Sequence, residues 1–293
     1  MGREVAESFL EASAVYERAS EAVGFDVSTL CFEGTLEDLT KTEVQQPALV
    51  ATSVACLRAV ESTGVKADAV IGHSVGEYAA LAAAGAIGDG ETVALVRERG
   101  VAMAETAREN PGTMAAIIGL DDDSVEGLCD SIAGVWVANF NCPGQVVVSG
   151  LHEPVATLLE AAESRGARRT VTLRVSGAFH SPLVAGAAER LRPRIESIDW
   201  REPALAFMST VTAQRERAPD LAAVLVKQLT APVRFTHAVR RLVSDGVDTF
   251  VEIGPGQVLS GLIKRCDRSV TTLSVGDLAG LAKLDEVLGG ARS

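Results

Sequence analysis

The segment Gly72-His73-Ser74-Val75-Gly76 places a serine between two glycines, where a short apolar run becomes an alanine-rich stretch. This is the G-x-S-x-G pattern, in which a sharp strand-to-helix turn exposes the serine hydroxyl. The N–H groups that follow such a serine lie at a helix N-terminus and favour negative charge. Acyl transfer needs this combination, because an oxyanion forms at the attacked carbonyl. We therefore predict that Ser74 is a nucleophile and that the Val75 N–H stabilises the oxyanion; a serine that only caps the helix is the alternative.

A serine nucleophile requires a general base, and the chain contains four histidines. His180 lies in "RVSGAFHSPLV", between a glycine and a proline, where the chain can return toward the serine. His73 lies within the pattern itself, and its side chain is expected to point away from that of Ser74. His152 lies in an acidic loop and His237 in the middle of a predicted helix, so both are expected at the surface or in ordinary packing positions. His180 is therefore the best-placed candidate for the base.

Apolar strands alternate with helices around these residues. Strands are predicted at 67–72, 204–210 and 249–254. Helices are predicted at 3–24, at 45–63 with Pro47 in the first turn, from Val75, at 90–110, near 182–196, near 219–229, near 233–246 and at 257–266. Such alternation is typical of an α/β fold with a mainly parallel sheet flanked by helices. With the serine motif at a strand end, we expect this core to be α/β-hydrolase-like.

The middle of the chain has a different pattern. Strands are predicted at 114–120, 135–141, 145–150 and 168–175, and helices at 123–134 and 153–166. The order β-α-β-β-α-β is that of a ferredoxin-like unit. We therefore expect two structural units, which are a core formed by 1–112 and 177–293 and an inserted subdomain formed by 113–176.

The composition narrows the choice of partners and compartment. The formal net charge is −12, which argues against nucleic acid and anionic membrane surfaces as partners. The N-terminus lacks the apolar run of a signal peptide, and no uncharged apolar run approaches the ~20 residues of a membrane span. We therefore expect a cytoplasmic protein, and a monomer because no interfacial stripe stands out. The five scattered cysteines have no metal-ligand spacing and are expected to be free thiols, so we predict no metal site.

Motifs along nearly the whole chain resemble those of one enzyme family. They begin at "TKTEVQQPAL" and continue in order with "GHSVGEYAAL", "LVRERGVAM", "GTMAAIIGL", "NFNCPGQVVVSG", "VSGAFHSPL" and "VEIGPGQVLSGLIKR". Together they resemble the malonyl-CoA:acyl carrier protein transacylases, the acyltransferases of fatty-acid and polyketide synthesis. The resemblance implies that a malonyl group moves from coenzyme A to the phosphopantetheine thiol of an acyl carrier protein through an acyl-enzyme on Ser74. The coenzyme A thioester is then a substrate, and no cofactor is implied.

The resemblance also implies roles for individual residues. His180 is the base for Ser74 without a catalytic carboxylate, and a main-chain oxygen near Gln228 holds its other ring nitrogen. Arg99 matches the arginine that grips the malonyl carboxylate, since a planar guanidinium makes two parallel charge-assisted hydrogen bonds to such a group. From the residues alone, the preferred interpretation of Arg99 is a solvated residue on the polar face of its helix, like Arg97.

Further positions are implied to lie near the substrate. Phe179 precedes the base, and its ring leaves no room for an α-methyl group on the acyl chain, although an ordinary core residue would look the same. Asn139 and Asn141 match positions that line the cleft between the two units, where they can hydrogen-bond the thioester arm. A turn before Pro143 is an equally good interpretation of both. His73 is counted with them as a substrate-binding candidate.

A local basic surface is needed if an enzyme with a net charge of −12 is to bind an acidic carrier protein. The segment "RGARRT" (165–170) supplies three arginines. We predict that Arg168 and Arg169 contact the carrier. Arginines that are only solvated are the alternative.

The chain departs from the family pattern at its start. Family members have a short strand and a "GQGSQ" loop before a Met-Gly dipeptide, and this chain begins at Met1-Gly2. That segment normally supplies a central strand and one of the two N–H groups of the oxyanion hole. We expect a start codon assigned too far downstream; a truncated, weakly active homologue that binds carrier protein is the alternative. A serine hydrolase or thioesterase of the α/β-hydrolase class is a further rival, and it would need an acidic residue and a late histidine.

Overall fold

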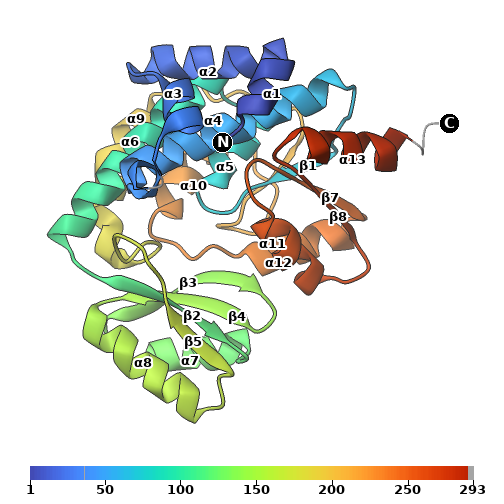
Figure 1. The fold of residues 1–293 in the computed structure, drawn as a ribbon. Helices are drawn as coiled ribbons and strands as arrows, with labels where there is room; N and C mark the ends of the chain where they lie inside the picture. The colour runs from blue at the N-terminus through green and yellow to red at the C-terminus, as the bar shows by residue number, and fades with distance from the viewer. Residues whose placement is uncertain (36, 290–293) are drawn as a thin grey trace.

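The fold has a larger part, built from both ends of the chain, and a smaller part built from its middle (Figure 1). The structure, a computed structural model, describes residues 1–35 and 37–289. The helices of the larger part are α1 (Arg3–Ser8), α2 (Leu10–Val23), α3 (Val27–Glu33), η1 (Asp38–Thr40), α4 (Thr42–Ser62), α5 (Gly76–Ala83), α6 (Asp89–Glu109), η2 (Pro182–Val184), α9 (Ala185–Glu196), α10 (Ala218–Gln228), α11 (Phe235–Ser244), α12 (Val258–Cys266) and α13 (Leu278–Gly289). Its strands are β1 (Ala69–Ile71), β6 (Ala206–Met208), β7 (Thr249–Ile253) and β8 (Thr271–Val275).

The strands of the larger part pair in parallel, β1 with β6 and β7 with β8. The main apolar core joins the surrounding helices to these strands through buried side chains such as Val54, Leu95, Phe207 and Val275. The predicted α/β class is therefore confirmed. Within the described residues the strands form two separate parallel pairs rather than one sheet, because β1 and β6, three residues each, pair only with each other.

The smaller part is a four-stranded antiparallel sheet with two helices on one face. Its elements are β2 (Thr113–Ile118), α7 (Asp122–Ser131), β3 (Val135–Cys142), β4 (Gln145–Gly150), α8 (His152–Ser164) and β5 (Arg169–Thr172). The strand order is β3-β4-β2-β5. Because strand side chains alternate between faces, Ala115 and Ile117 pack with the core of α7 and α8, whereas Met114 and Ala116 pack with Phe179 on the other face. The face without helices therefore meets the segment that returns to the larger part.

Two predictions about helices need correction, and two elements, β8 and α13, were not predicted. The helix predicted at 3–24 is broken at Phe9, whose backbone is extended (φ −130°, ψ 119°) and whose side chain packs against the main core. Pro47 lies inside α4 rather than in its first turn, because this helix begins at Thr42. The helix at 257–266 is followed by β8 and α13, and β8 is held by its pairing with β7. At Phe9 and at β8, tertiary packing decides over local propensity.

In residues 1–35 and 37–289, no helix is both long enough and apolar enough to cross a membrane.

Candidate active site

Ser74 lies in a sharp turn between the carboxyl end of β1 and the start of α5. Its φ of 51° is in the left-handed region, which is unusual for a residue other than glycine and marks a strained turn. Gly72 makes the turn possible, since a Cβ there would lie only 2.1 Å from the carbonyl carbon of Gly76. The strand, turn and helix that the serine motif predicted are therefore all present.

His180 meets Ser74 from a distant part of the chain, with Nε2 2.7 Å from the serine Oγ. Its Nδ1 lies 3.0 Å from the carbonyl oxygen of Gln228 and 3.1 Å from that of Ala231. Carbonyl oxygens only accept hydrogen bonds, so Nδ1 carries the ring proton and Nε2 is free to accept from the serine hydroxyl. Two main-chain carbonyls thus orient the ring without a carboxylate.

Burial keeps the His180 imidazole neutral. The residue is 4% exposed, and desolvation, followed by the charges of Arg99 and His73, lowers its pKa to about 3. A protonated ring would be poorly solvated and would face a cation, so the charged form is disfavoured. At neutral pH the ring is in the form that can accept the serine proton.

The Arg99 guanidinium is buried beside Ser74 without a carboxylate partner. Arg99 is 1% exposed and donates to Ser74 Oγ at 3.2 Å, to Gln228 Oε1 at 3.3 Å and to Gln46 Oε1. In the described part of the chain no acidic side chain forms an ion pair with it, and its Nε has no hydrogen-bond partner. Because a buried cation that contacts no anion directly is costly, the site is suited to an anionic ligand.

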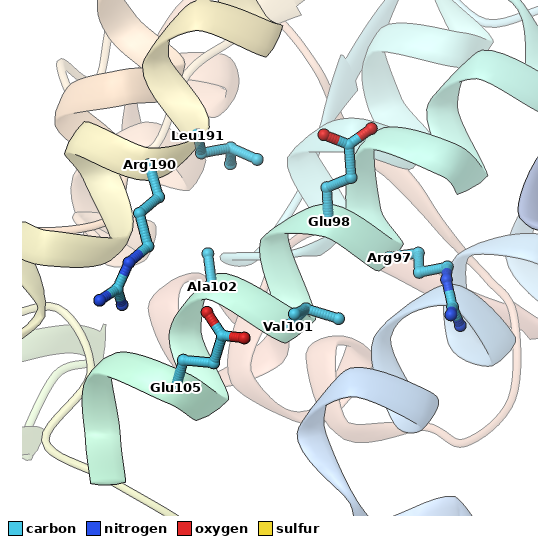
Figure 2. Close-up of a pocket in the computed structure, with 7 residues that line it drawn as sticks. All are labelled: Arg97, Glu98, Val101, Ala102, Glu105, Arg190 and Leu191. Carbon is cyan, nitrogen blue, oxygen red and sulfur yellow. The ribbon is translucent and has the colours of Figure 1, made fainter. Parts of the chain in front are cut away.

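Arg97, on the same helix α6, faces a different surface. Its guanidinium lies over the ring of Phe25, 4.8 Å from the centroid. It also lines an open groove between α6 and α9 that contains neither Ser74 nor His180 (Figure 2). The groove is lined by Arg97, Glu98, Val101, Ala102, Glu105, Arg190 and Leu191. Since residues two apart on a helix point in nearly opposite directions, the interpretation of Arg99 as a solvated residue like Arg97 is wrong.

Known proteins resemble this chain in sequence over most of its length. A family model described as an acyl transferase domain matches residues 1–288. The malonyl CoA-acyl carrier protein transacylase of Bacillus subtilis is 41% identical over 283 residues, which cover 94% of this chain and 89% of that protein. A protein of the same name from Staphylococcus aureus is 38% identical over 270 residues, 90% of this chain and 87% of that protein. The chain belongs to the acyl transferase family.

Solved structures in the acyl transferase family have the same fold. An acyl-carrier-protein-S-malonyltransferase from Bartonella henselae superposes with a TM-score of 0.94 at 37% identity, covering 99% of this chain and 95% of that one. A malonyl-transacylase in complex with its type II PKS acyl-carrier protein also has a TM-score of 0.94, at 38% identity over 98% of this chain and 94% of that one. The likeness therefore includes both the larger and the smaller part.

Of the two asparagines that the family resemblance placed in a cleft, Asn141 contacts the serine turn and Asn139 is buried on the same strand. Asn141 Oδ1 lies 2.8 Å from Nε2 of His73, which follows Gly72 in that turn. Asn139 and Asn141 are 6% and 8% exposed and belong to β3; Asn139 is paired with Val147 of β4, and Asn141 lies at a register shift in this pairing. Their interpretation as turn residues is therefore wrong; the turn follows them.

The remaining candidates lie at the edges of the site or away from it. Phe179 immediately precedes the base and packs between the main core and the smaller sheet. The Val75 N–H, at the start of α5, has no acceptor within the part of the chain that the structure describes. Arg168 and Arg169 are exposed at the beginning of the edge strand β5. Among the described residues, no group of three or more His, Cys, Asp or Glu side chains is placed to hold a metal ion.

Two side chains in contact with the site were missed from the sequence. Gln46 is 6% exposed and accepts a hydrogen bond from Arg99. Glu77 is fully buried and accepts from the Gln228 amide and the Thr210 N–H. A carboxylate in an otherwise alanine-rich helix, three residues after the nucleophile, is the signal that could have identified Glu77.

Proposed function

We propose that this acyltransferase moves a malonyl group from coenzyme A to the phosphopantetheine thiol of an acyl carrier protein. The observation that carries the proposal is the buried Arg99 guanidinium, which has no carboxylate partner and lies 3.2 Å from Ser74 Oγ. A malonyl group can supply the missing anion while its thioester carbonyl lies at the serine. Relatives at 41% and 38% identity are named for this activity, and one structural neighbour is bound to its acyl-carrier protein.

The first half-reaction loads the serine. His180 Nε2 accepts the proton of Ser74 Oγ, and Oγ attacks the thioester carbonyl. The oxyanion that forms accepts from the Val75 N–H. When the intermediate collapses, the carbon–sulfur bond breaks, and the coenzyme A sulfur takes the proton from His180. The products are free coenzyme A and a malonyl ester on Ser74.

The second half-reaction is the reverse with a different thiol. The phosphopantetheine thiol gives its proton to His180 and attacks the ester carbonyl. Collapse breaks the bond to Ser74 Oγ, which regains its proton from the imidazolium. Both half-reactions are complete with these substrates and side chains, so we propose no metal or other cofactor.

Substrate selection uses two further side chains. The Arg99 side chain exchanges its hydrogen bond to Ser74 Oγ for the malonyl carboxylate, which frees the hydroxyl and anchors the acyl group. An acetyl group has no carboxylate and gains nothing from this contact. The Phe179 ring, next to the base, restricts the space beside the α-carbon, and a single methyl group is worth about 1–3 kcal/mol in such discrimination.

The proposal extends to the two parts of the fold. We propose that residues 1–112 and 177–293 are an α/β-hydrolase-like core and that 113–176 are a ferredoxin-like insertion. The strand order β3-β4-β2-β5 in a βαββαβ unit supports the insertion. A serine turn at the carboxyl end of a strand from a parallel pair supports the core.

Labelled malonyl-CoA tests the function directly. We expect a covalent label on Ser74, absent from the Ser74→Ala variant, that passes to an acyl carrier protein carrying phosphopantetheine. Loss of the label to water faster than to the carrier would favour a hydrolase instead. A wild-type protein that binds carrier protein but acquires no label would favour a non-catalytic role.

A further inference from the structure

Glu77 is a buried carboxylate with no part in the reaction described above. It is 0% exposed and lies in the first turn of α5, three residues beyond the nucleophile. One of its oxygens accepts from the Thr210 N–H at 2.5 Å, and the other accepts from Gln228 Nε2. Burial raises its pKa, and the two hydrogen bonds act in the opposite direction. Because both oxygens accept from N–H groups, the arrangement suits the ionised form.

The Gln228 amide lies between this carboxylate and Arg99. Its Nε2 also donates to the carbonyl oxygen of Ser74 at 3.1 Å, and its Oε1 accepts from Arg99 at 3.3 Å. An amide has a donor end and an acceptor end, and only its surroundings decide which end points where. Here a carboxylate, which can only accept, lies at one end, and a guanidinium, which can only donate, lies at the other. The two charged groups therefore select one orientation of the amide.

We propose that Glu77 is a positioning residue for the malonyl site, which orients Gln228 so that the amide oxygen rather than the NH2 group faces Arg99. This inference rests on the proposed function, because the site it serves is the one that binds the malonyl carboxylate. With this orientation, one guanidinium nitrogen is held by Gln46 and another by Gln228. The guanidinium is thus in place before the substrate arrives, which lowers the cost of binding.

Two single variants distinguish the effect of Glu77 on the orientation of the Gln228 amide from the effect of its negative charge. Glu77→Gln removes the charge. The oxygen of the new amide at position 77 must still accept from the Thr210 N–H, so the NH2 group of the same amide faces Gln228. The Gln228 amide must then turn to present its oxygen to that NH2 group. Glu77→Asp keeps the charge but is one methylene shorter, and cannot reach Thr210 and Gln228 together. We expect both to lower kcat/KM for malonyl-CoA about tenfold or more, chiefly through KM, with a change of less than about threefold for acetyl-CoA.

Glu252→Gln is the matched control. Glu252 is a partly buried carboxylate that accepts from the N–H groups of Leu259 and Ser260 at the start of α12, outside the site. We expect it to leave the ratio of malonyl to acetyl loading unchanged. If Glu77→Gln increases malonyl loading and Glu77→Asp has no effect, Glu77 acts through its charge alone and the proposal is overturned. An unchanged ratio in both Glu77 variants overturns it equally.

A double variant keeps the test valid if the single variants do not fold. In E77Q/Q228E, the new amide at position 77 accepts from Thr210 and donates to the new carboxylate at position 228, so these three groups remain paired; the carbonyl oxygen of Ser74 alone loses the hydrogen bond that Gln228 Nε2 donates to it. That carboxylate faces Arg99 and neutralises it. We expect a folded protein that loads acetyl but has lost its preference for malonyl, and a retained preference would refute the proposal. If the wild-type protein takes no malonyl label at all, the proposed function fails instead, and the two failures are distinguishable.

Discussion

At the scale of single residues, the proposed function assigns the choice of acyl group to Arg99. Arg99→Ala is expected to lower kcat/KM for malonyl loading by about 100-fold, because two charge-assisted hydrogen bonds to the carboxylate are lost. Acetyl loading should change far less, since acetyl has no carboxylate. Arg97→Ala, two positions away on α6 and facing another surface, is the control and should leave both rates unchanged. Mass spectrometry of the acyl-enzyme measures both; an equal loss with the two acyl groups would remove the carboxylate contact from the mechanism.

The burial of His180 leads to a prediction about the pH dependence of acyl loading, also at the scale of a single residue. Its pKa is about 3 instead of 6.5, so kcat/KM for acetyl loading should not fall until the pH is well below 6.5. The Arg99 charge is the second cause of this lowering. Removing a cation makes the imidazolium easier to form, so the Arg99→Ala variant should have a higher His180 pKa and lose activity at a higher pH. pH–rate profiles of acetyl loading by both proteins measure the shift, and a shift to lower pH would contradict it.

At the scale of elements, the contact between β1 and α5 depends on one glycine. A Cβ at Gly72 would lie 2.1 Å from the carbonyl carbon of Gly76 and 2.2 Å from the backbone nitrogen of Glu77. Gly72→Ala should therefore cost more than about 3 kcal/mol of unfolding free energy or prevent folding. Gly76→Ala is the control, because a Cβ there meets no atom within 4 Å, and it should change stability by less than about 1 kcal/mol. Urea unfolding measures both, and equal stabilities would show that the strand and helix can separate at no cost.

Local sequence patterns predicted most elements because the forces that form them act over a few residues. The apolar run and the glycines placed β1, the turn at Ser74 and α5 correctly. The break at Phe9 was not predictable in this way, because it depends on packing against the main core. The same holds for β8, which is stabilised by pairing with β7.

Local patterns in the sequence pointed to Ser74 and His180, whereas Arg99 was predictable only from a family motif. Nothing local distinguishes Arg99 from Arg97, and the motif rather than the helical periodicity pointed to the arginine that is buried beside Ser74. Glu77 lies within the motif "GHSVGEYAAL", but the motif did not indicate a role for it. Its partners Gln228 and Thr210 lie 151 and 133 residues away in the sequence, so the contact that gives it a role exists only in the folded chain.

At the scale of the whole molecule, the dyad joins two segments that are separated by the smaller part. Ser74 precedes the smaller part in the chain and His180 follows it, 106 residues later. The returning segment is packed closely against α6, since a Cβ at Gly177 would lie 2.4 Å from that of Ala107. The packing of the returning segment against α6 therefore helps to place His180 beside Ser74.

Charge is the other property of the whole molecule that bears on function. The net charge of −12 repels an acidic carrier protein at long range, so the carrier needs a local basic surface. Arg168 and Arg169 are exposed on the edge strand of the smaller part, in the chain just before the segment that carries the base. We propose this pair as the carrier contact.

Reversing both charges tests that contact, because the two half-reactions use different partners. Arg168→Glu/Arg169→Glu should raise KM for the carrier protein about tenfold at low salt and leave malonyl loading from coenzyme A unchanged. The effect should shrink as salt screens exposed charges. Lys66→Glu/Arg201→Glu is the control with the same change in net charge, because both residues are exposed near the amino ends of β1 and β6, opposite Ser74. A loss of the same size in both half-reactions, or in the control, would mean that net charge rather than this arginine pair governs carrier binding.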